Sequence, residues 1–256
     1  MLSNDERENI ILLLKLGYSI NEINKITHKS KGTIYTYYKK LFGKKIKDVS
    51  INEADDEFIG ELVGLFVGDG NAYHNKKEGK YMIRFFFNCN DLSHNSQLVE
   101  FFSKNFEKSP NIYKEENVLI FTYISKKLFK FLLNFVVWDI SVDILGRNRK
   151  SRTIYLKPRD YSLNFKIGFL RGFMDSDGHI SNKKIQFSSA SQRIMDKTMS
   201  FLLECGFIDM NYYFYEEKRK NRVGMYHIAL NKSERMNFFR RVQPRNLRKL
   251  NAPAGI

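Results

Sequence analysis

Apolar and polar positions follow the same order in two long blocks of this chain. Each block opens with an apolar segment of helical character and continues with period-two alternation, which is typical of a half-buried strand. A helical pattern, another strand and another apolar helix complete each block. An order that repeats in this way predicts a duplicated unit of mixed helix and strand. The matching segments, first block before second, are 61–70 and 169–178, 81–88 and 184–190, 96–106 and 193–205, 119–126 and 225–232, and 128–137 and 235–242.

The two opening segments carry small residues one helical turn apart and then end in Asp-Gly. Small residues at this spacing let two helix backbones approach closely, and a glycine after the last helical residue is a common helix stop. We therefore expect two helices that pack together and stop side by side. Asp69 and Asp177 would then lie at the same end, where two carboxylates beside two negative helix ends favour a divalent cation. The small residues are Gly64 and Gly68 in the first segment and Gly172 and Ser176 in the second.

The alternative is a pair of unrelated core helices that both end in Asp-Gly. Chain spacing favours duplication, because a lysine follows the later strand of each block at nearly the same separation from the aspartate. Lys126 lies 57 residues after Asp69, and Lys232 lies 55 residues after Asp177. Two independent domains would not be expected to agree so well.

The sequence Phe-Leu-Arg-Gly-Phe-Met-Asp-Ser-Asp-Gly at 169–178 resembles the motif of the LAGLIDADG homing endonucleases, and a looser copy stands at 61–70. Monomeric members of that family carry two motif copies in one chain. The resemblance covers roughly residues 58–242. It implies an α/β (α+β) fold of two αββαββα repeats, with the motif helices at the interface between the repeats.

The resemblance also implies that the last acidic residue of each motif binds catalytic metal. Those residues are Asp69 and Asp177, and the preceding Gly68 and Ser176 are assigned to the same metal site. Asp175 has an apolar counterpart in the first motif and receives no metal role.

In the family, a lysine at the strand-to-helix position lies near the metals and assists the water or the phosphate. Lys126 and Lys232 occupy this position, with Lys127 as an alternative to Lys126. A solvated lysine at a helix start is the other interpretation. The resemblance implies a monomeric, site-specific double-stranded DNA endonuclease that uses Mg²⁺, with Mn²⁺ as a substitute. A transcription regulator that does not cleave DNA and an intron RNA maturase on the same fold are the alternatives.

Charge agrees with a nucleic-acid partner. The chain has 43 Lys and Arg against 28 Asp and Glu, a net charge of +15, and such an excess is an argument about partners. Basic residues gather at the join between the blocks, at a hairpin-like tip and at the end of the chain, where they predict phosphate contacts more than a solvated face. The first hairpin of each repeat is expected to read bases in the major groove, although a shift of one residue in strand phase would reverse the face. The expected DNA contacts are Asn71, Tyr73, Lys76, Lys80, Arg84, Arg149, Arg152, His179, Ser181, Lys183, Gln186, Arg219 and Arg222.

The first 43 residues predict a separate three-helix unit. Helices are expected over 5–16, 20–27 and 31–41, and Ser19 and Ser30 can cap the second and third. This segment looks like a helix-turn-helix DNA-binding domain, in which the third helix enters the major groove. A plain three-helix bundle used for protein contact is the alternative. Lys31, Thr33 and Tyr35 are the residues expected on DNA. The predicted divisions are 1–43, a linker at 44–57, repeats at 58–146 and 165–256, and a basic join at 147–164.

Other classes of protein receive no support from the sequence. Two isolated cysteines fit a reducing interior, and the five histidines do not cluster as a zinc site would require. No apolar run is long enough for a membrane span, and the N-terminus does not resemble a signal peptide. We expect a free-standing protein without self-splicing termini. We also expect it in the cytoplasm and on the nucleoid when DNA-bound, or in an organelle if organelle-encoded.

Overall fold

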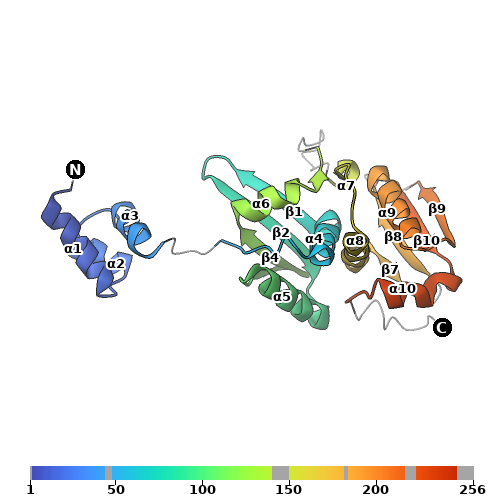
Figure 1. The fold of residues 1–256 in the computed structure, drawn as a ribbon, viewed down its shortest axis with the longest axis horizontal. Helices are drawn as coiled ribbons and strands as arrows, with labels where there is room; N and C mark the ends of the chain where they lie inside the picture. The colour runs from blue at the N-terminus through green and yellow to red at the C-terminus, as the bar shows by residue number, and fades with distance from the viewer. Residues whose placement is uncertain (1, 44–47, 140–149, 182–183, 217–222, 247–256) are drawn as a thin grey trace. The chain divides into compact units, whose positions relative to one another are not determined.

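The computed structural model describes residues 2–43, 48–139, 150–181, 184–216 and 223–246. The chain forms two compact units, Met1–Asp48 and Val49–Ile256, which Figure 1 draws as ribbons. The second unit begins before the end of the predicted linker, because the side chains of Val49 and Ile51 are buried in its core. Among the described residues, no helix is both long enough and apolar enough to cross a membrane.

The first unit contains three helices, α1 (Asn4–Lys15), α2 (Ile20–Thr27) and α3 (Lys31–Phe42). Their starts follow from capping chemistry. Ser19 and Glu22 form a reciprocal capping box, and Ser30 accepts a hydrogen bond from the backbone N–H of Thr33. The three predicted helices and both predicted caps are therefore confirmed. A small apolar core holds the helices together, and its buried members are Ile10, Leu14, Ile23 and Ile34.

The second unit contains two repeats of the order helix, two strands, helix, two strands, helix. Each repeat forms a four-stranded antiparallel sheet, β1-β2-β4-β3 in the first and β7-β8-β10-β9 in the second. This arrangement confirms the predicted duplication and the mixed α/β class. The first repeat comprises α4 (Asp56–Asp69), β1 (Gly70–Asn75), β2 (Lys80–Asn88), α5 (Leu92–Phe106), β3 (Asn111–Glu115), β4 (Val118–Ile124) and α6 (Lys126–Leu133). The second comprises α8 (Leu163–Asp177), β7 (His179–Ile180), β8 (Ile185–Ser189), α9 (Gln192–Glu204), β9 (Met210–Tyr215), β10 (Met225–Leu230), a 3₁₀ turn at Lys232–Glu234 and α10 (Arg235–Arg241).

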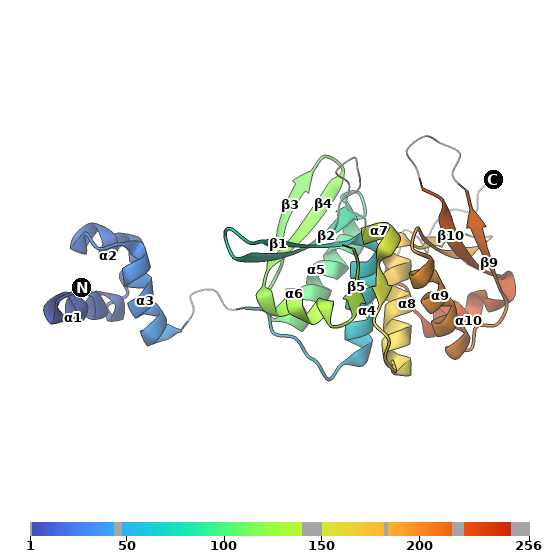
Figure 2. The same cartoon turned by 90° about the horizontal axis from the view of Figure 1, so that it is seen from above.

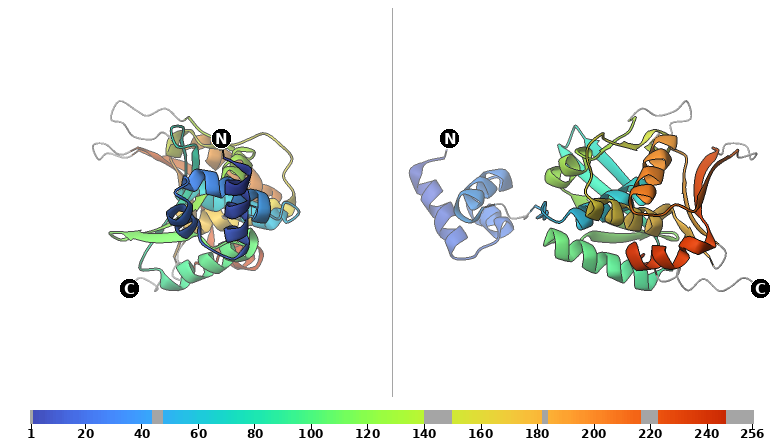
Figure 3. Two further views of the ribbon diagram at one scale, coloured as in Figure 1. Left: turned by 90° about the vertical axis from the view of Figure 1, so that its left-hand side faces the viewer. Right: turned by 45° about the vertical axis from the view of Figure 1, so that its right-hand side comes forward.

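Helices α4 and α8 lie side by side between the two sheets (Figure 2). The remaining helices cover one face of each sheet, α5 and α6 in the first repeat and α9 and α10 in the second (Figure 3). Alternate residues of β2, such as Phe85 and Phe87, are buried beneath α5 among other aromatic rings. The intervening residues, such as Arg84, point to the opposite face of the sheet.

The join between the repeats has a structure that the sequence pattern did not predict. The expected helix at 128–137 ends at Leu133, and the chain then enters the short strand β5 (Val136–Val137). This strand pairs with β6 (Tyr155–Leu156), which follows the four-residue helix α7 (Lys150–Thr153).

Candidate metal centre and nucleic-acid interface

The backbones of α4 and α8 approach each other so closely that not even a Cβ atom fits between them at the glycines. A Cβ atom on Gly64 would lie 2.7 Å from the amide nitrogen of Phe173, and one on Gly172 would lie 2.8 Å from that of Leu65. Ordinary contacts of a Cβ atom begin at about 3.4 Å. The predicted small-residue stripe is therefore the contact surface. It also extends one turn further back through Gly60 and Gly168, each of which faces the backbone of the other helix.

The two motif aspartates end this helix pair together. Asp69 is the last residue of α4 and Asp177 is the last residue of α8. Gly68 faces α8 across the interface, because a Cβ atom on it would lie 2.6 Å from Cβ of Ser176 and 3.3 Å from Cγ of Asp177. The hydroxyl of Ser176 donates to the carbonyl of Gly172 at 2.9 Å. The structure thus brings together the four residues predicted to form a metal site.

Steric contacts explain why a glycine follows the aspartate at the end of each helix. Gly70 and Gly178 have extended backbones, with φ of −90° and −76°, so neither uses the left-handed conformation common at helix ends. A Cβ atom on Gly178 would overlap Met174, and one on Gly70 would overlap Phe66. Each helix therefore passes directly into a strand at the aspartate.

Lys150 is the lysine that the structure places beside the aspartates. Its side chain is buried, and its Nζ atom donates to the carbonyl oxygens of Phe66 at 2.7 Å and Val67 at 2.9 Å. These carbonyls belong to the last turn of α4, where a positive charge is favourable. Burial lowers the pKa of Lys150 to about 8, and the charges of Asp177 and Asp69 act in the opposite direction.

Sequence reasoning grouped Lys150 with the basic join and assigned it no catalytic part. Lys150 stands in a run of basic residues, and the sequence of that run does not indicate that one of them turns inward. Lys126, by contrast, lies over the ring of Tyr81 at 5.4 Å. The residue before it, Ser125, donates its backbone N–H to Tyr81, which pairs with His74. His74 is four residues along β1 from Gly70, a distance of about 13 Å along the strand.

Lys232 begins the 3₁₀ turn after β10, and its side chain is exposed. Catalytic roles for Lys126 and Lys232 stay predictions. Both lysines hold positions at the start of a helical turn after a strand, as expected, whereas Lys150 interacts electrostatically with both aspartates.

An open groove of about 740 Å³ runs past the ends of the two helices. Its walls include Asp177 and Lys150, together with Asn71 at the start of the first sheet and His227 of the second sheet. Among the residues that the structure describes, no three His, Cys, Asp or Glu side chains gather as a metal-binding group. Asp177 lines this groove, and Asp69 lies between Gly68 and Gly70, which also line it.

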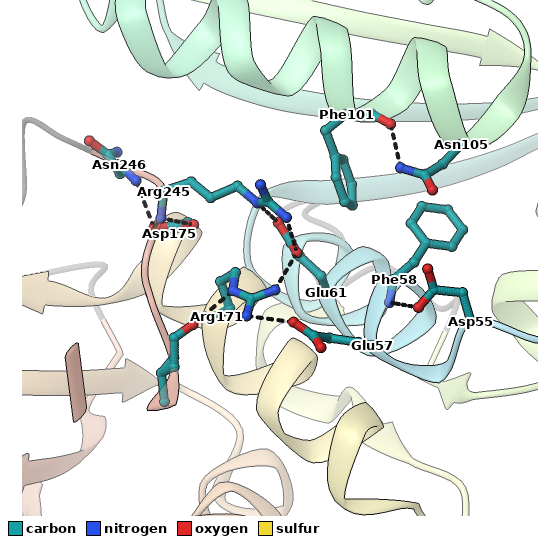
Figure 4. A network of polar contacts seen from close by, with 11 residues as sticks. Asp55, Glu57, Phe58, Glu61, Phe101, Asn105, Arg171, Asp175, Arg245 and Asn246 are labelled. Atoms are coloured by element: carbon teal, nitrogen blue, oxygen red, sulfur yellow. Dashed lines mark hydrogen bonds and ion pairs between the residues drawn. The ribbon is translucent and has the colours of Figure 1, made fainter. Parts of the chain in front are cut away.

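A network of ions whose central members, Glu61 and Arg171, are buried joins α4 and α8 on another part of their surface (Figure 4). Glu61 of α4 accepts from Arg171 of α8 at 3.0 Å and from Arg245 at 2.5 and 3.0 Å. Arg171 also pairs with Glu57 at 2.6 Å. Because Glu61 is 1% exposed, these pairings are what make its burial as a charge tolerable.

Asp175 belongs to this network and not to the metal site. Its carboxylate accepts the backbone N–H groups of Arg245 at 2.9 Å and Asn246 at 3.1 Å (Figure 4). Asp175, the first acidic residue of the motif, therefore fixes the C-terminal segment against α8, which agrees with leaving it out of the predicted metal ligands.

Comparisons with known proteins agree with this fold. A family model described as a LAGLIDADG-like domain matches residues 164–243. The solved structure of I-DmoI in complex with DNA and Ca superimposes with a TM-score of 0.53 at 19% identity, covering 74% of this chain and 91% of that chain. Mesophilic variants of the homing endonuclease I-DmoI give a TM-score of 0.54 at 18% identity, covering 74% of this chain and 97% of theirs.

The part of this chain that these matches cover has the LAGLIDADG fold. It is also similar to the replication factor C small subunit of Methanocaldococcus jannaschii, with 28% identity over 197 residues, or 75% of this chain. The chain spans about a tenth of the length of that curated relative.

The LAGLIDADG sheets place the predicted base-reading residues as follows. In the first sheet, Asn71 pairs with Arg84 and Tyr73 pairs with Met82, on the face away from the helices. Lys80 pairs with Asn75 at the end of the hairpin, and Lys76 lies in its turn. The predicted contacts of the first repeat thus share one face, with Lys76 at the tip.

In the second sheet, His179 pairs with Gln186 on the equivalent face, while Ser181 bonds the backbone of Lys184 at the turn. Arg152 lies in α7, next to the groove residue Ser151. Four predicted contacts fall outside the described residues, and they are Arg149, Lys183, Arg219 and Arg222.

The separate first unit carries the remaining predicted contacts. Lys31, Thr33 and Tyr35 lie in the first half of α3. The hydroxyl of Thr33 is 2.8 Å from that of Ser30, so both belong to the helix cap, and Tyr35 stacks on Tyr38 at 6.2 Å between ring centroids. Their contact with DNA stays a prediction.

Proposed function

We propose that this protein is a site-specific endonuclease that cuts double-stranded DNA with the help of a divalent metal ion. The observation that carries the proposal is that Asp69 and Asp177 end the adjoining helices α4 and α8, with Asp177 on a groove lined by residues of both sheets. A purely structural helix pair has no need of two carboxylates beside two negative helix ends, where their charges are unfavourable.

The donor atoms at this place suit Mg²⁺, with Mn²⁺ as a substitute. Carboxylate oxygens are the ligands that Mg²⁺ prefers, and this ion is commonly held by one or two carboxylates together with water and phosphate. Asp69 and Asp177 would hold the ion, with Gly68 and Ser176 beside them. When bound, it would supply activation of water and compensation of charge on the leaving oxygen. Crystal structures of I-DmoI with DNA contain Ca or Mn, which supports a divalent ion here.

Lys150 supplies the fixed positive charge of the proposed site. Its ammonium group is held by two carbonyls of α4 and lines the groove with Asp177. A phosphate that enters this groove would meet a cation that is already oriented, and preorganised charge of this kind is an effective means of stabilising a transition state.

The difference between the two sheets indicates an asymmetric substrate. The hairpin of the first repeat has six residues in β1, while that of the second has two in β7, and their outward residues differ. Two unlike surfaces in a single chain fit an asymmetric double-stranded site and a protein that acts as a monomer. We further propose that the three-helix unit adds affinity for DNA through α3 without taking part in the chemistry.

The test is a selection for cleavage. Purified protein and the Asp177→Asn variant would be incubated with a randomised double-stranded DNA library, in Mg²⁺ and in EDTA, and the cut ends would be sequenced. We expect Mg²⁺-dependent cuts at one long asymmetric site and none with the variant. Enrichment of a bound sequence without cuts would replace the endonuclease by a DNA-binding regulator. RNA would then be tested for the maturase alternative.

A further inference from the structure

Gln186 is the centre of a hydrogen-bonded cluster on the outward face of the second sheet. We call this group the Gln186 cluster. It consists of Lys184 directly before β8, Gln186 and Ser188 in β8, Tyr213 in β9 and His227 in β10. Register places these residues on the face that the proposed DNA would occupy, because their alternates Ile185, Phe187 and Ile228 are in the core. On this sheet, Gln186 and His227 therefore lie on the outward face.

All four hydrogen-bonding positions of the Gln186 amide are used inside the cluster. Its Oε1 atom accepts from Lys184 at 2.7 Å and from the Tyr213 hydroxyl at 3.2 Å. Its Nε2 atom bonds Ser188 at 3.0 Å and His227 at 2.9 Å. An amide offers two acceptor and two donor positions, so none remains for a base edge. Gln186 is also only 8% exposed.

The orientation of the amide follows from its partners. A lysine ammonium can only donate, so the atom beside Lys184 is the carbonyl oxygen, and the atom beside His227 is the nitrogen. Because an amide nitrogen only donates, Nδ1 of His227 accepts, and the imidazole proton is on Nε2. Burial and then the charge of Lys184 lower the pKa of His227, which favours this neutral form.

Two hydrogen-bond donors therefore stand at the rim of the cluster. Lys184 is exposed and has further N–H groups beyond the one on Gln186, and His227 presents its Nε2–H. His227 also lines the groove that contains Asp177. In the major groove, guanine offers two acceptors, N7 and O6, whereas adenine offers one acceptor and one donor. Lys184 and His227 each present only donors on this face, which suits guanine, the purine that presents only acceptors.

The first repeat uses the same position differently. Arg84 is opposite Asn71, two residues after Asp69, just as Gln186 is opposite His179, two residues after Asp177. Nε of the Arg84 side chain donates to the sulfur of Met82 at 2.9 Å. A guanidinium with five donors is suited to direct contact with guanine or phosphate.

We infer that Gln186 is a positioning residue for DNA specificity, which holds Lys184 and His227 as the groups that read guanine at adjacent positions of the second half-site. This inference rests on the proposed DNA-binding function. It also departs from the sequence-based expectation that Gln186 itself contacts DNA.

A binding selection in EDTA would test the inference, since it does not depend on cleavage. The full chain would be used to enrich bound sequences from a randomised double-stranded DNA library. We expect Lys184→Met and His227→Phe each to remove a guanine preference of roughly 5-fold, the lower end of the range for a bidentate pair, at its own position. Gln186→Leu should weaken both preferences at once, although neither reading side chain is changed. Arg84→Leu, the matched control, should alter only the other half-site.

Gln186→Glu separates positioning from direct reading. The carboxylate keeps the acceptors for Lys184 and Tyr213 but cannot donate to Nδ1 of His227, whose remaining neighbour there is the Ser188 hydroxyl at 2.8 Å. The preference that depends on His227 should therefore change while that of Lys184 remains. A glutamine that reads a base itself would select adenine, and its change to glutamate would favour cytosine at the same position. That second pattern would overturn the inference.

Other results also decide the question. Gln186 variants that shift a base position unaffected by Lys184→Met and His227→Phe would contradict the inference, as would unchanged preferences in Gln186→Leu. Thermal melts would establish that each variant is folded. A wild-type chain that enriches no sequence would overturn the proposed DNA function together with this inference. The contradicting results for the Gln186 variants would overturn the inference alone, because the wild type would still bind a specific sequence.

Discussion

Replacement of Gly64 by alanine tests whether the close approach of α4 and α8 sets the geometry of the site. The added Cβ atom would overlap the carbonyl oxygen of Phe169 and lie 2.7 Å from the amide nitrogen of Phe173. Both obstacles are backbone atoms, which cannot rotate away. The helices would have to separate by roughly 1 Å to restore ordinary contact, and a gap of that size forfeits a quarter to a half of the dispersion attraction across it.

The expected cost of Gly64→Ala is about 3 kcal/mol, the upper part of the range for overpacked cores. For a unit of about 200 residues, this corresponds to a fall in melting temperature of roughly 6–12 °C. Thermal unfolding followed by circular dichroism would measure it. The same separation would displace Asp69 relative to Asp177, and a shift of 1 Å in a catalytic arrangement can reduce activity about 100-fold. Cleavage should therefore fall even at temperatures where the variant remains folded.

Gly68 supplies a matched comparison. A Cβ atom there would collide chiefly with the side chain of Ser176, not with backbone. Gly68→Ala should thus be destabilising alone and should be rescued by Ser176→Gly, which makes room for the new methyl group. Gly64→Ala has no such partner. A Gly64→Ala variant with unchanged melting temperature, or a Gly68→Ala variant that Ser176→Gly does not rescue, would refute the reasoning.

Four further outcomes are expected. Asp177→Asn should abolish cleavage while DNA binding in a mobility-shift assay stays within a few fold, and full activity in this variant would exclude the assigned site. Lys150→Met should reduce the cleavage rate roughly 100-fold, whereas Lys126→Met and Lys232→Met should have smaller effects; the reverse order would return the catalytic role to the predicted lysines. The logarithm of DNA affinity should fall with the logarithm of salt at about −0.9 per phosphate contacted, and a flat titration would contradict phosphate binding. The pKa of His227 in the folded protein is below its ordinary value of 6.5, so the unfolded chain binds the proton at a higher pH than the folded protein does. The neutral form of His227 therefore stabilises the fold above pH 6.5. This contribution is lost as the pH falls through the folded pKa. Chemical denaturation at pH 7 and pH 5 should show a larger loss in the wild type than in His227→Phe, and equal losses would contradict this assignment.

The lysines show where prediction by chain spacing reached its limit. Lys126 and Lys232 were predicted because they repeat at similar separations from the aspartates, and the structure confirms the repeat from which they were inferred. Equal spacing shows that two residues hold equivalent positions, but it does not show where those positions lie. The register places Ser125 beside Tyr81, at the far end of β1 from Asp69. Lys150 reaches the aspartates from the join, which has no described counterpart in the second repeat.

Sequence by itself determined the features that depend on local chemistry. The capping serines, the period-two strands, the small-residue stripe and the Asp-Gly ends are each specified within a few residues, since caps, strand pleats and helix turns are short-range structures. Their repetition along the chain was enough to indicate two similar halves and a pair of carboxylates between them.

Tertiary structure alone decided which side chains turn inward and which partners they meet. Lys150 is buried at the end of α4, and Asp175 binds the backbone of Arg245, 70 residues away. Gln186 uses its whole amide within the sheet. Nothing in the neighbouring sequence marks these residues, because the free energy of a buried polar group is set by the hydrogen bonds that distant segments bring to it.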